Sequence, residues 1–60
     1  MMTHKMLLQI LVEAEARRDD ERLPDEVRER SAETVSLCKQ RMAMEGLTRD
    51  ALERLAAQEG

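Results

Sequence analysis

Residues 7–14 read LLQILVEA, and this stretch decides the fold of the chain. Its residues Leu7, Ile10, Leu11 and Ala14 are three or four positions apart. This spacing is typical of an apolar stripe along one side of an α-helix. The sequence therefore predicts an amphipathic helix around this stretch, whose stripe packs against another element.

The bounds of this first helix follow from the residues on either side. Thr3 is a suitable N-cap, because its hydroxyl can accept a hydrogen bond from a backbone N–H of the first turn. Pro24 ends the helix, because proline disfavours the helical conformation in the residue before it. We predict a helix over residues 4–22, in which the charged residues 17–22 form a solvated extension.

A second helix is predicted over residues 24–45. Pro24 suits a first helical turn, and the negative charges of Asp25 and Glu26 favour a helix N-terminus. Gly46 can adopt the left-handed conformation that commonly ends a helix. The predicted inner stripe consists of Val27, Ser31, Thr34, Val35, Cys38 and Met42.

A short third helix is predicted over residues 49–58. Thr48 can act as its N-cap, and Leu47 is placed to pack against Leu52 across the cap. Its inner face would contain Leu52, Leu55 and Ala56. The chain is thus expected to be one all-α domain, an antiparallel helical hairpin followed by a short third helix.

Composition limits how this fold can be stabilised. The 60 residues include no Phe, Tyr or Trp, so the core consists of aliphatic side chains, Met and Cys38. A domain of about 60 residues buries only about 60% of the surface of its unfolded chain. One cysteine cannot form an internal disulfide, and one cysteine with one histidine cannot supply four zinc ligands. We therefore expect a homodimer that completes a helical bundle.

Charge and hydropathy bear on location. The net charge is −3, and acidic and basic residues are interspersed. This balance disfavours nucleic acid and anionic membranes as partners. No segment approaches the length of a membrane span, and the run Met6–Val12 is short, interrupted by Gln9 and followed by acidic residues, unlike a signal peptide. We expect a cytoplasmic protein.

The first helix carries more apolar surface than one neighbour can cover. Leu7, Ile10 and Leu11, with Cys38 of the second helix, are expected in the core or dimer interface. Leu8 and Val12 lie roughly 100° away around the helix. Together with Leu37 and Met44 they form the predicted protein-binding set. The alternative is a monomer in which the third helix folds over Leu8 and Val12.

Few residues could support catalysis. His4 is the lone side chain that ordinarily titrates near neutrality, and it lies near a helix end. Cys38 is predicted on an inner face, where a thiol behaves as a small apolar group. We expect no enzyme activity, no catalytic residues, no cofactor and no metal.

The leading prediction is a small regulatory or adaptor protein that acts by binding another protein, in addition to itself. The alternative is a dimeric nucleic-acid-binding regulator. It would use an arginine cluster at the turn of the hairpin, made of Arg17, Arg18, Arg22, Arg28 and Arg30.

Overall fold

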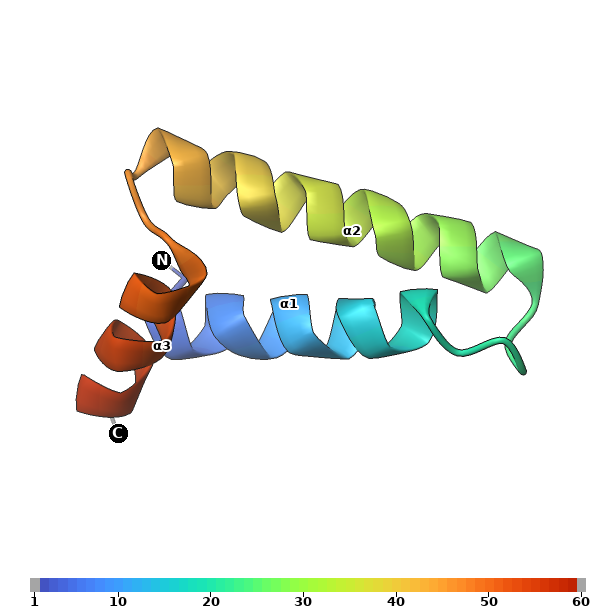
Figure 1. Cartoon of the computed structure of the whole chain (residues 1–60), viewed down its shortest axis with the longest axis horizontal. Coiled ribbons are helices and arrows are strands. Elements are labelled where there is room, and N and C mark those ends of the chain that lie inside the picture. The colour runs from blue at the N-terminus through green and yellow to red at the C-terminus, as the bar shows by residue number, and fades with distance from the viewer. Residues whose placement is uncertain (1, 60) are drawn as a thin grey trace.

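The computed structural model describes residues 2–59, which form three helices: α1 (His4–Arg18), α2 (Asp25–Met44) and α3 (Arg49–Gln58). α1 and α2 form an antiparallel hairpin, and α3 lies against α1 near the N-terminus (Figure 1). No strand occurs among the described residues. The predicted all-α fold with three helices is confirmed.

The two predicted threonine N-caps are both present. The Thr3 hydroxyl accepts a hydrogen bond from the Met6 backbone N–H at 3.1 Å. The Thr48 hydroxyl accepts one from the Ala51 N–H, also at 3.1 Å. Each hydroxyl satisfies a backbone donor that has no partner within the helix. α1 and α3 therefore begin where local sequence predicts.

α1 ends at Arg18, four residues before the predicted end, so the expected helical extension over residues 19–22 is wrong. The Asp20 carboxylate accepts a hydrogen bond from the Arg22 backbone N–H at 3.0 Å, and this favours a turn. The Arg28 Nε also donates to the Arg18 carbonyl oxygen at 3.4 Å. A neighbouring helix thus supplies a partner for a carbonyl at the end of α1.

α2 begins at Asp25, with Pro24 as its N-cap residue, and ends through a glycine motif. Gly46 has φ +69°. Its N–H donates to the Ala43 carbonyl at 3.1 Å, and the Leu47 N–H donates to the Met42 carbonyl at 2.8 Å. These two bonds define a Schellman motif, which confirms the predicted role of Gly46.

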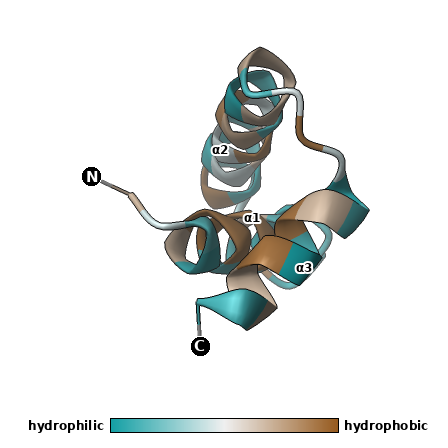
Figure 2. Ribbon diagram, turned by 90° about the vertical axis from the view of Figure 1, so that its left-hand side faces the viewer, coloured by the Kyte–Doolittle hydropathy of each residue, from teal (hydrophilic) through white to brown (hydrophobic). Residues whose placement is uncertain are grey.

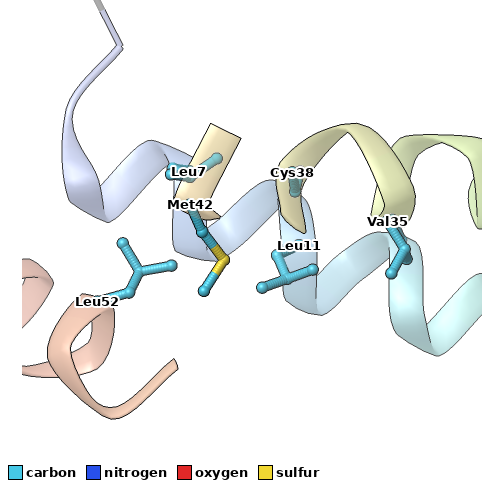
Figure 3. Packing of buried hydrophobic residues seen from close by; sticks show 7 residues of the cluster. Leu7, Leu11, Val35, Cys38, Met42 and Leu52 are labelled. Carbon is cyan, nitrogen blue, oxygen red and sulfur yellow. The ribbon is translucent and has the colours of Figure 1, made fainter. Parts of the chain in front are cut away.

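The core lies where the three helices meet (Figure 3). Leu52 of α3 and Leu11 of α1 are the most deeply buried large side chains, at 0% and 1% exposed. The buried cluster is made of Leu7, Leu11, Ala14, Val35, Cys38, Met42 and Leu52. Leu7, Leu11 and Cys38, predicted in the core or the dimer interface, lie in this cluster, and Ile10 is half-buried against it.

The aliphatic face of α1 is thus closed within one chain. Leu7 and Leu11 pack in the core formed with α2 and α3, so they offer no free surface to a second copy. Val27, predicted on the inner stripe of α2, is instead exposed. α3 packs in cis, as in the monomeric alternative, although it leaves Val12 exposed.

Polar contacts fix α3 on α1 at both of its ends. Arg49 Nη1 donates to Glu15 Oε1 at 2.6 Å. At the other end, the Glu59 carboxylate accepts hydrogen bonds from the backbone N–H groups of Lys5 at 2.8 Å and His4 at 3.2 Å. Because the first turn of α1 has no acidic residue of its own, Glu59 supplies the negative charge that a helix N-terminus favours.

Candidate protein-binding groove

The two flanks of the hairpin differ. Viewed along the hairpin, α3 lies on one flank of α1, and the N-terminal residues lead away on the other (Figure 2). Two shallow depressions of about 570 and 560 Å³ lie between α1 and α2. Helical spacing places Ile10 and Glu13, which line the first depression, away from Leu8 and Glu15 on the side that α3 covers. We call these depressions together the hairpin groove.

One half of the hairpin groove is mainly apolar and lies at the open end of the hairpin. Its lining residues are Met2, Leu7, Leu37, Cys38, Gln40, Arg41, Met44 and Glu45. Leu37 is 64% exposed and Met44 is 88% exposed. Cys38 and Leu7 belong to the core and form the floor. This half therefore presents flexible and aliphatic side chains above a closed core.

The other half lies near the turn and carries more charge. Its lining residues are Ile10, Glu13, Ala14, Arg17, Glu26, Val27, Arg30, Ser31 and Thr34. Two small polar residues reduce its apolar area, but neither is left without a partner. The Ser31 hydroxyl donates to the Val27 carbonyl at 2.9 Å, and the Thr34 hydroxyl donates to the Arg30 carbonyl at 3.2 Å.

The exposed apolar side chains gather on this flank. The large ones that are exposed among the described residues are Met2, Met6, Val12, Val27, Leu37 and Met44. Four of them line the groove or its rim at Met2, Val27, Leu37 and Met44. Met6, 50% exposed, lies one turn before Ile10 on the same side of α1. Of this set, Val12 alone lies outside this flank.

The predicted protein-binding residues are therefore divided between two locations. Leu37 and Met44 both line the apolar half of the groove, two turns apart on α2. Leu8 is half-buried and packs against the core, and Val12 is 44% exposed on the α3 side of α1. The structure thus brings two of the four together and separates the other two from them.

Sequence reasoning missed Met2, Met6 and Val27 as members of this surface. Met6 and Ile10 are four positions apart, so helical spacing alone places them on one side of the first helix. This spacing identifies an exposed side only when the flank that the third helix covers is known. That knowledge depends on contacts such as Arg49 with Glu15, which lie 34 positions apart.

The predicted arginine cluster is largely engaged within the chain. Arg18 pairs with Asp19 at 3.0 Å, and Arg22 pairs with Asp20 at 3.0 Å. These hydrogen bonds hold the pKa of both aspartates below the usual range. Arg28 lies 3.6 Å from Asp25. The remaining members, Arg17 and Arg30, line the groove and form no ion pair with a carboxylate of residues 2–59.

Cys38 and His4, the residues considered for chemical reactivity, lie in different environments. Cys38 is buried, and burial followed by the nearby Glu15 charge raises the pKa of its thiol. His4 lies at the start of α1, at its contact with α3. Its Nδ1 lies 2.7 Å from Glu59 Oε2 at the α3 contact. Within residues 2–59 no group of three potential metal ligands lies close together.

None of the helices that the structure describes has an apolar stretch long enough to cross a membrane. Comparison with known proteins finds no family model, no curated protein and no solved structure that matches the chain.

Proposed function

We propose that this chain is a small, non-enzymatic regulatory or adaptor protein that acts by protein–protein association, and that the hairpin groove is the surface on which this association depends. One observation carries the proposal. The exposed large apolar side chains, apart from Val12, gather along the flank of the hairpin that α3 leaves open. A concentration of this kind is typical of an interaction site.

The amount of exposed surface supports the same proposal. The accessible surface is 4597 Å². A monomeric protein of 6.9 kDa is expected to expose about 4,000 Å². The excess of about 600 Å² is close to the roughly 800 Å² that each partner buries in a standard protein interface. Association through the groove would remove this excess, so the proposal includes completion of a helical bundle by self-association.

The composition of the groove favours a helical partner. Methionines such as Met2 and Met44 adapt to differently shaped partners, because the side chain is unbranched and polarisable. Two roughly antiparallel helices leave a channel into which further helices can pack. We place the protein in the cytoplasm as part of this proposal, because an unpaired thiol such as Cys38 stays reduced there.

The experiment compares the double variant Leu37→Asp, Met44→Asp with the control Val12→Asp. Both place charge on exposed apolar positions, but only the double variant alters the groove. The wild-type chain, the double variant and the control each serve as bait, and the captured proteins are quantified. Circular dichroism verifies that each bait is folded. Loss of capture in the double variant alone supports the proposal. Equal capture by all three chains would contradict it.

The nucleic-acid alternative has weaker support. Arg18, Arg22 and Arg28 lie beside carboxylates of their own chain, so phosphate would have to displace a partner already present. Titration with duplex DNA and RNA at low and high salt tests this alternative. Binding that weakens steeply as salt rises would support it, since phosphate contacts release counterions.

A further inference from the structure

We infer that the occupant of the hairpin groove is a second copy of this chain, packed face to face about a twofold axis parallel to the hairpin, so that α1 of each copy lies against α2 of the other. This inference rests on the proposed function, because it takes the groove as the association surface. It adds the orientation of the two copies and the residues that set their register.

The position of α3 permits this arrangement. α3 lies on the flank of the hairpin opposite the groove, and it makes no close backbone approach to α2 (Figure 2). Two hairpins can therefore meet groove to groove, with the α3 helices on the outside. Face-to-face packing of this kind is isologous, the commonest symmetry of protein dimers.

The charges near the turn are ordered so that one copy complements another. Along the groove, Glu13 precedes Arg17 on α1, and Glu26 precedes Arg30 on α2. Because the helices are antiparallel, Arg17 lies level with the first turn of α2 and Glu13 lies one turn farther from the hairpin turn. If α2 of a second copy lay at the same level along the hairpin axis, its Arg30 would lie near Glu13 of the first copy. Its Glu26 would then lie near Arg17 of the first copy.

These four charges are available for a partner. None of them forms an ion pair with a residue of the described chain, although other rim charges do, such as Arg41 with Glu45 at 3.0 Å. The twofold axis makes each contact occur twice. A dimer would thus gain two Glu13–Arg30 pairs and two Arg17–Glu26 pairs.

The same features disfavour a copy turned end for end. In that orientation the charged half near the turn would cover the apolar half that contains Leu37 and Met44. Charges without partners are costly to remove from water. With the axis parallel to the hairpin, the apolar halves cover one another and the charged halves meet.

The test uses charge reversal and mixing. Sedimentation equilibrium is measured for the wild-type chain, Glu13→Arg, Arg30→Glu and an equal mixture of the two variants. Like charges opposed across an interface weaken binding, so each variant alone should raise the dimer dissociation constant at least about tenfold. In the mixture, a dimer of one chain of each kind regains opposite charges at both Glu13–Arg30 contacts. It should bind within about threefold of the wild type.

The controls separate this inference from the proposed function. Lys39→Glu reverses an exposed charge on the flank of α2 that faces away from the groove, two turns after Ala32, and should dimerise like the wild type. A wild-type chain that stays monomeric up to about 1 mM would overturn the inference. Failure of mixing to restore dimers would overturn it too. In either case the capture experiment with the Leu37 and Met44 variant still tests whether the groove binds another protein, the part of the proposed function that does not involve self-association.

Discussion

Replacing Leu52 by alanine tests how α3 is held on the hairpin. Leu52 is fully buried, and its side chain points into the cluster formed by α1 and α2 (Figure 3). Buried leucine-to-alanine replacements cost about 2–5 kcal/mol, through lost burial and the cavity left behind. A domain of this length has a total stability of only about 3–9 kcal/mol. Leu52→Ala should therefore remove much of the free energy of unfolding.

The assay is thermal and urea unfolding followed by circular dichroism. For a domain of this size, 1 kcal/mol corresponds to a shift of about 4–8 °C in the unfolding midpoint, so Leu52→Ala should lower the midpoint by on the order of 10–30 °C. The control is Val12→Ala, an exposed position outside the groove. It should change the free energy of unfolding by no more than about 0.5 kcal/mol.

Hydrogen exchange identifies where the stability is lost. α3 approaches the backbone of α1 alone, and besides Leu52 it is attached by the buried Ala56 and by polar contacts near its ends. Its amides should therefore exchange faster in Leu52→Ala, with less change in α2. A midpoint within about 5 °C of the wild type, with α3 amides still protected, would show that Leu52 does not anchor this helix.

Three further predictions concern single positions. Gly46→Ala should cost about 1–2 kcal/mol in urea unfolding, because φ is +69° although the added methyl group meets no atom within 4 Å; an unchanged midpoint would contradict the strain argument. The Lys5 and His4 hydrogen bonds lower the pKa of Glu59, so its stabilising contribution is present above the unfolded pKa and is lost as pH falls through the folded one. Glu59→Gln should therefore flatten the loss of thermal stability below about pH 4.5, and an acid limb identical to the wild type would refute this. Burial and a raised thiol pKa should make Cys38 react slowly with iodoacetamide in the native chain and rapidly in urea; equal rates would place the thiol in solvent.

The parts of the fold that local sequence predicts are those with local causes. Thr3, Thr48 and Gly46 act through hydrogen bonds to residues within five positions, so their patterns are readable along the chain. The core positions Leu7 and Leu11 are readable for a similar reason, because helical spacing alone puts them on one face.

The errors in the predicted fold involve contacts between residues that lie farther apart along the chain. The end of α1 combines the local Asp20–Arg22 turn with a contact from Arg28, which lies ten positions beyond the Arg18 carbonyl to which it donates. The burial of Leu8 depends on where α3 packs. That position is set by Glu59 with the first turn of α1 and by Arg49 with Glu15, contacts that span at least 34 positions. Spacing alone cannot distinguish the flank that contains Leu8 from the one that contains Met6.

The open flank follows from the composition of the chain. α3 covers one side of α1 with Leu52 and Ala56, both buried, and residues 2–59 include no further helix for the other side. An aromatic side chain buries about 150–250 Å², enough to extend from a rim position across a shallow groove, but the chain has none. Small residues such as Ser31 and Thr34 cannot replace that area. The sequence thus provides a core for one flank and leaves the apolar side chains of the other, Leu37 and Met44 above all, exposed.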